Sequence, residues 1–167
     1  MSFFTSKKKK YGTIGALLVI IVSLWYLFIF TNQLKKSDQF SIFTQTSLVV
    51  GNENLTVYIA DTSELRTQGL SDTTLLPEGY GMLFVFPQAG KYSFWMKDMR
   101  YAIDIAWINE KRQVIDIAEN LSPDTYPQTF TPKEPARWVL EVPAGYLKKK
   151  NIQIGSFVIA SDKKVLQ

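Results

Sequence analysis

The residues from Tyr11 to Phe30 (YGTIGALLVIIVSLWYLFIF) form a run of twenty residues without a charge. A helix rises about 1.5 Å per residue, so this run would span about 30 Å, the thickness of a bilayer's hydrocarbon core. We therefore expect a single transmembrane helix over residues 11–30, with the lipid bilayer as its partner. A buried core helix or a cleaved signal peptide is the alternative, but the run is longer than a usual signal core, and the remaining chain is too small to cover it on all sides.

The lysines that flank this run predict its orientation. Four lysines, Lys7 to Lys10, precede it, and only Lys35 and Lys36 follow closely. Because positively charged flanks stay on the cytoplasmic side, the N-terminus should be cytoplasmic and the rest of the chain extracytoplasmic. The expected order is a cytoplasmic basic segment (1–10), a single-pass signal anchor in the cell membrane (11–30), a linker (31–43) and an extracytoplasmic domain (44–167).

Composition excludes several classes of function. Lys7 to Lys10 supply the whole formal charge of +4, and residues 31–167 carry 15 basic and 15 acidic groups. Such a balance lacks the positive field expected of a nucleic-acid binder, so no nucleic-acid partner is expected. The chain has no cysteine and no histidine, which excludes disulfides, serine–histidine catalysis and the usual zinc sites. We expect neither a metal nor a cofactor.

Alternating apolar residues predict that residues 44–167 are mainly strands. Leu55, Val57 and Ile59 are spaced by two, the period of a half-buried strand. A short helix should follow, because Asp61 can cap it and Gly69 can end it. Further strands are expected at residues 48–50, 81–86, 92–96, 103–108, 113–118, 137–142 and 156–160. This pattern predicts an antiparallel, mainly β sandwich or barrel-like domain with one short helix.

The segment from residue 119 to 136 breaks this pattern. It contains four prolines, which predict that it stays out of regular structure. Long loops of this kind in compact domains are often functional, and a stiff surface crossover is the alternative.

Several motifs in a fixed order identify a family resemblance. They are Arg66-Thr67-Gln68-Gly69-Leu70, Gly81–Phe86 (GMLFVF), Phe94-Trp95-Met96-Lys97, Ile103-Asp104-Ile105 and Leu140-Glu141-Val142-Pro143-Ala144-Gly145. With them the chain resembles the domain-of-unknown-function family 192 of bacteria and archaea, over roughly residues 57–159. The resemblance implies a mainly β domain, often exported or membrane-anchored, without an established activity. Ser71 and Lys97-Asp98-Met99 depart from the usual methionine and Lys-Asn-Thr. If the asparagine and threonine of the family contact a ligand, that contact is altered in this chain.

Charged residues lie inside the apolar motifs. Asp104 shares its strand face with Ala102 and Ala106, and Glu141 stands between two aliphatic residues. A buried charge without a partner is costly, so these carboxylates need cations or a ligand. We expect Asp104 to be held by a cation, Arg66 or Lys97.

Two arrangements satisfy this requirement. In the first, Arg66, Lys97, Asp104 and Glu141 pair with one another beneath the surface. In the second, they line a polar pocket, which is the usual form of a small-molecule site. The residues of that pocket would be Arg66, Phe94, Trp95, Met96, Lys97, Asp104 and Glu141.

The sequence thus predicts an uncharacterised membrane-anchored extracytoplasmic domain that binds a small polar ligand or an envelope component, or mediates an interaction. One alternative is a cell-envelope hydrolase in which Asp104 and Glu141 act as general acid and base on a glycosidic bond, with their carboxyl groups about 5 to 10 Å apart. Another is a structural accessory that contacts a membrane protein through residues 11–30. Catalysis is not required by any motif.

Overall fold

The computed structural model describes residues 16, 18–29 and 39–166. They belong to two compact units, Met1–Ser41 and Ile42–Gln167. In the first unit, residues 18–29 are helical and their large apolar side chains are exposed. Over these described ranges, no helix combines the length and apolar character needed to span a bilayer. The predicted span 11–30 extends beyond them at both ends, and residues 1–10 lie outside them, so both remain predictions.

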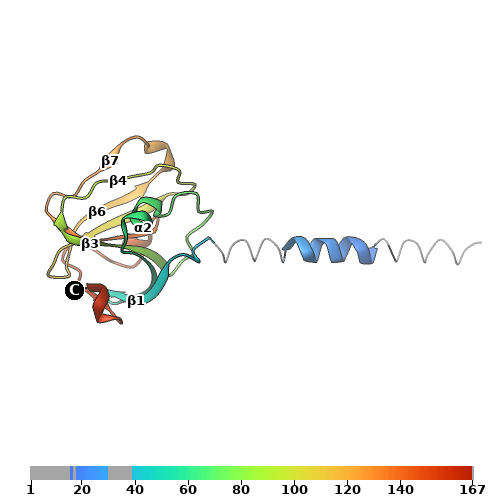
Figure 1. Ribbon diagram of the computed structural model, residues 1–167, viewed down its shortest axis with the longest axis horizontal. Helices are drawn as coiled ribbons and strands as arrows, with labels where there is room; N and C mark the ends of the chain where they lie inside the picture. Colours follow the sequence, from blue (N-terminus) through green and yellow to red (C-terminus); the bar gives the residue numbers. More distant parts are fainter. Residues whose placement is uncertain (1–15, 17, 30–38, 167) are drawn as a thin grey trace, which may run out of the picture. The chain divides into compact units, whose positions relative to one another are not determined.

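The second unit is mainly β and is built on one curled seven-stranded sheet, in the order β6-β5-β8-β3-β2-β1-β9 (Figure 1). A second sheet consists of β4 and β7, which run side by side. The strands are β1 (Thr44–Val50), β2 (Glu53–Ala60), β3 (Tyr80–Gly90), β4 (Phe94–Trp95), β5 (Ile103–Ile108), β6 (Val114–Leu121), β7 (Thr129–Phe130), β8 (Ala136–Pro143) and β9 (Val158–Ala160).

The large sheet is mixed, so the prediction of an antiparallel domain was wrong. β2 and β3 pair in parallel, with Val57 opposite Gly81, whereas the other neighbouring pairs are antiparallel. Parallel neighbours need a crossover connection. Helix α2 (Ser63–Gln68) and the loop that follows it in the sequence supply that crossover. A hydrogen-bonded bridge between Gln113 and Phe157 joins the opposite ends of the sheet, which gives it the form of a half-barrel rather than a sandwich.

Several local predictions need correction. Thr62, not Asp61, caps α2, because its hydroxyl accepts a hydrogen bond from the Leu65 amide at 3.2 Å. Gly69 ends this helix with a φ of 48°, as predicted. A second short helix, α3 (Tyr146–Lys149), was not predicted. The segment 119–136 is partly regular, since it contains the end of β6, the 3-10 helix η1 (Pro123–Thr125) and strand β7. A second 3-10 helix, η2 (Lys163–Leu166), lies near the C-terminus.

The two faces of the sheet are both covered by apolar residues. The inner face of the half-barrel carries the main core, which includes Leu48, Val57, Leu83, Trp138 and Leu147. The opposite face carries Met82, Phe84, Ile105 and Trp107, all buried. Phe94 of β4 packs on this second face, with ring centroids 4.8 Å from Phe84 and 6.3 Å from Trp107. The small sheet and α2 therefore form a second layer over the outer face.

Asp104 is fully buried on the inner face and is held by main-chain amides. Its carboxylate accepts hydrogen bonds from the amides of Asn120, at 2.8 Å, and Leu147, at 3.1 Å. The first amide belongs to a bulge in β6, and the second to the first turn of α3. The prediction that Arg66 or Lys97 holds this carboxylate was wrong. Strand alternation sends it away from both cations and toward two amides that would otherwise lack partners.

We expect Asp104→Asn to destabilise the fold by about 3 kcal/mol, because the amide nitrogen of asparagine would face a backbone N–H and leave a buried donor unpaired. Chemical denaturation of the purified protein measures this loss. The control is Glu110→Gln in the exposed turn between β5 and β6, which should change stability by less than about 0.5 kcal/mol. Equal stabilities for the two variants would show that the amides find other partners.

Candidate ligand-binding cavity

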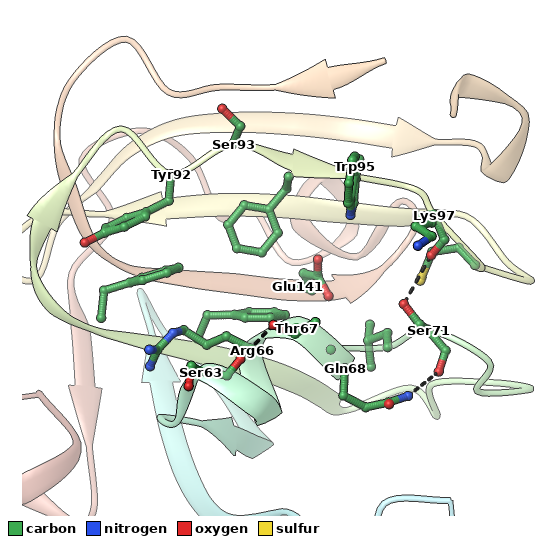
Figure 2. Close-up of a pocket in the computed structure, with 16 residues that line it drawn as sticks. Ser63, Arg66, Thr67, Gln68, Ser71, Tyr92, Ser93, Trp95, Lys97 and Glu141 are labelled. Atoms are coloured by element: carbon green, nitrogen blue, oxygen red, sulfur yellow. Dashed lines mark hydrogen bonds between the residues drawn. The ribbon is translucent and has the colours of Figure 1, made fainter. Parts of the chain in front are cut away.

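A cavity of about 350 Å³ lies between α2 and β4 on the outer face of the sheet (Figure 2). Ser63, Arg66 and Thr67 reach it from α2, where spacings of three and four residues place them on one side of the helix. Aromatic residues around β4 form the other wall, and Glu141 of β8 lies between the two walls. The cavity is thus built from segments far apart in the sequence.

Glu141 is the buried polar group of this cavity. The register of β8 places it opposite Met82 of β3 and Ile105 of β5, neither of which can neutralise its charge. The side chain is only 5% exposed, and its Oε2 has no hydrogen-bond partner among the described residues. Burial raises the pKa of Glu141 to about 8, so the carboxyl is mostly protonated at neutral pH.

Two cations lie at the edge of the cavity, and neither pairs with a carboxylate there. The Arg66 guanidinium donates hydrogen bonds to the carbonyl oxygens of Asp61 and Val85, at 2.5 and 2.9 Å. The Lys97 ammonium lies 5.9 Å from the centre of the Trp95 ring. Among the described residues, no ion pair joins either cation to Glu141 or Asp104. The predicted network of internal ion pairs is therefore absent from this part of the chain.

Aromatic rings form the wall opposite α2. Phe86 and Tyr92 stack with ring centroids 3.5 Å apart, and the Phe94 ring packs edge-on against Phe84. Trp95 is 53% exposed, and its ring lies 5.9 Å from that of Tyr126, which belongs to the proline-rich segment. The wall is therefore packed at its base and open at Trp95, where a ligand could reach it.

The two sides of the cavity are joined by hydrogen bonds to main-chain carbonyl oxygens. The Ser71 hydroxyl donates to the Lys97 carbonyl at 3.2 Å, and the Asp72 amide donates to the Asp98 carbonyl at 2.8 Å. A second hollow of about 610 Å³ adjoins the first and shares Ser71, Trp95 and Lys97 with it. The loop after α2 and the turn after β4 are thus held together beside one continuous depression.

The structure brings five of the seven predicted site residues to the cavity, and two lie elsewhere. Those that line it are Arg66, Phe94, Trp95, Lys97 and Glu141. Met96 is buried beneath the turn and does not line it. Asp104 pairs in register with Val142 and thus points to the opposite face from Glu141. The two carboxyl groups do not share a cleft, so they cannot act together on one glycosidic bond.

Helix α2 contributes more residues to the cavity than the predicted Arg66. Ser63 and Thr67 line the cavity together with Arg66. Their spacing within a short predicted helix was the available signal, since positions i, i+3 and i+4 share one face. Tyr92 was also missed, because it lies just before β4 and outside the motifs that carry the resemblance.

Comparison with known proteins identifies the family. Residues 46–159 match the family model described as "Uncharacterized ACR", the domain-of-unknown-function family 192. The chain belongs to this family. It is 30% identical over 104 residues to a UPF0127 protein of Thermococcus gammatolerans, in a match that covers 61% of this chain and 64% of that protein. It is 28% identical over 78 residues to a UPF0127 protein of Pyrococcus furiosus, covering 46% of this chain and 64% of that protein.

The match thus spans less than two thirds of the length of these archaeal relatives. Two solved structures share the fold. One is a protein of Sinorhizobium meliloti described as a candidate transcription regulator, with a TM-score of 0.68 and 25% identity, covering 71% of this chain and 95% of that one. The other is a protein of unknown function from Novosphingobium aromaticivorans, with a TM-score of 0.63 and 24% identity, covering 70% and 84%.

We expect the stability of the protein to fall as pH rises from about 5 to about 9. The folded state holds the Glu141 proton up to a pKa of about 8, whereas the unfolded chain releases it near the ordinary value of 4.5. The free energy of unfolding attributable to this group is therefore highest below pH 4.5 and is lost by the time the pH has passed 8.

Chemical denaturation across this pH range measures the effect. Glu141→Gln, which cannot ionise, should remove most of the decline, while the exposed Glu110→Gln should retain it. A decline that persists in Glu141→Gln would assign it to other groups.

Proposed function

We propose that residues 44–167 form a small-ligand binding or interaction module, and that its ligand occupies the cavity between α2 and β4. The observation that carries this proposal is Glu141, whose buried Oε2 has no hydrogen-bond partner among the described residues and lies beside an open cavity. Buried polar atoms are almost always hydrogen-bonded, so an exception next to a hollow indicates a place for a ligand group. The mixture of aromatic walls and a few polar groups is typical of small-molecule sites.

We further propose that this module works outside the cytoplasm, attached to the membrane through residues 11–30. The uncharged run and the four lysines before it support this placement. A small polar molecule or a component of the cell envelope would then be the ligand. A structural accessory that contacts a membrane protein through the same run is the remaining alternative.

Two other functions receive less support. A hydrolase that uses a carboxylate pair needs both carboxyl groups in one cleft, whereas Asp104 and Glu141 point to opposite faces of the sheet. A nucleic-acid-binding role, as the description of the Sinorhizobium meliloti protein would suggest, is not favoured by the equal numbers of acidic and basic groups in residues 31–167.

A ligand screen by thermal shift tests the binding function. We expect members of a small-metabolite library to raise the melting temperature of the purified full-length chain, because a ligand at 100 times its Kd stabilises the folded state by about 2.7 kcal/mol. Thr67→Trp should fill the cavity from α2 and abolish these shifts. Lys111→Trp, in the exposed turn between β5 and β6, should leave them in place. Shifts that survive Thr67→Trp would place the ligand elsewhere, and a library without hits would contradict the proposal.

Protease accessibility tests the location. Protease added to intact cells should digest residues 44–167 if the N-terminus is cytoplasmic and the domain lies outside. The cytoplasmic control is any soluble enzyme of the same cells, which should be cut only after lysis. Protection of the domain until lysis would reverse the predicted orientation.

A further inference from the structure

The fixed charges that line the 350 Å³ cavity itself are positive, whereas carboxylates line the adjoining hollow. Of the residues that line the 350 Å³ cavity, only Arg66, Lys97 and Glu141 can carry a charge near neutral pH. Burial raises the pKa of Tyr101 to about 12, with the charge of Glu141 adding to the rise, so this phenol stays neutral. The titratable and charged groups that face Glu141 or share its cavity are Arg66 of α2, Tyr92 and Lys97 on either side of β4, and Tyr101 before β5. The adjoining hollow adds three carboxylates, those of Glu64, Asp72 and Asp98.

Two of the aromatic rings that line the cavity already have a cation near them. The Phe86 ring stacks on Tyr92, and the Arg66 guanidinium lies 5.3 Å from its centre. The Trp95 ring has the Lys97 ammonium 5.9 Å from its centre. A cationic ligand near either ring would meet the like charge of Arg66 or Lys97. The cavity is therefore better suited to a negatively charged group.

Glu141 has a role in such a site only in its protonated form. A protonated carboxyl offers one O–H donor, and its hydrogen bond to a carboxylate is short and charge-assisted. Burial, which raises the pKa of Glu141 to about 8, keeps that proton in place at neutral pH. An ionised Glu141 would instead repel an anion at close range.

We propose that the cavity binds a small carboxylate, which accepts a hydrogen bond from the uncharged Glu141 carboxyl at the floor and is neutralised by the Lys97 ammonium at the edge. Glu141 lies at the floor of the cavity and Lys97 at its edge, so a ligand between them could reach both. Arg66 adds positive potential, although two of its hydrogen bonds are committed to the carbonyls of Asp61 and Val85. The inference rests on the proposed binding function and names its ligand class.

Three aromatic probes of similar size test the charge preference of the cavity. Benzoate, benzamide and benzylamine share an aromatic body and differ in the charge of the head group. Titration calorimetry on the purified full-length chain at pH 6.5 should give a Kd for benzoate at least about tenfold below those of the other two, a difference of 1.4 kcal/mol. From pH 6.5 to pH 9.0 the benzoate Kd should rise about tenfold, because the protonated fraction of Glu141 falls by that factor.

Variants assign the two contacts. In Glu141→Gln the benzoate Kd should change less than about twofold between pH 6.5 and 9.0, because the amide donates at both, whereas Glu110→Gln should keep the wild-type dependence. Lys97→Met should weaken benzoate about tenfold and leave benzamide within about twofold, since only the anion uses the ammonium. The matched control is Lys111→Met, an exposed lysine outside the cavity, which should weaken neither probe.

The outcomes separate this inference from the binding function itself. Tighter binding of benzylamine or benzamide than of benzoate, or a benzoate Kd in the wild type that does not change with pH, would overturn the carboxylate ligand. Failure of benzoate to bind, while members of the metabolite library do bind and Thr67→Trp abolishes their binding, would overturn the inference and keep the binding function. Failure of the probes and of the whole library would overturn both.

Discussion

The pairing of β5 with β8 fixes the positions of the two buried carboxyl groups in the described part of the chain. Asp104 stands opposite Val142, and Ile105 stands opposite Glu141, so the two carboxyl groups lie on opposite faces of the sheet. A slip of one residue would exchange the two faces and leave neither group in its present surroundings. The core, the attachment of α3 and the floor of the cavity all depend on this register.

The two carboxyl groups then differ because of what meets them. Asp104 receives two main-chain N–H groups, from a bulge in β6 and from α3, and so it joins three elements of the inner layer. Glu141 meets only apolar neighbours in register, and its Oε2 has no partner in the described structure. An unsatisfied buried polar atom costs stability, by about 1 to 3 kcal/mol. Such a cost is common at sites shaped for a ligand rather than for the fold.

The walls of the cavity are held by uncharged hydrogen bonds more than by ion pairs. Hydrogen bonds from Ser71 and Asp72 to carbonyls of the turn after β4 set the distance between its two walls. The ion pair between Arg100 and Asp72 lies nearby, but both side chains are more than half exposed, so it adds little. The floor stands on two central strands, whereas Lys97 and Trp95 are exposed at the edge. The rigid floor and the accessible edge of the cavity together suit a site that a small molecule can enter.

The sequence by itself determined every strand except the two-residue β7, the end of α2 at Gly69 and the family, because these depend on local periodicity, on backbone conformation and on short motifs. It also identified Lys97, Asp104 and Glu141 as unusual, because charges inside apolar strands are costly wherever they point. Only the tertiary structure decided the parallel pairing of β2 with β3 and the face to which each carboxyl belongs. All six residues of β5 are buried, so alternation shows that neighbours point to opposite faces without showing which face is the core. The amides that hold Asp104 come from residues 16 and 43 positions away, and a local pattern carries no record of contacts at that distance.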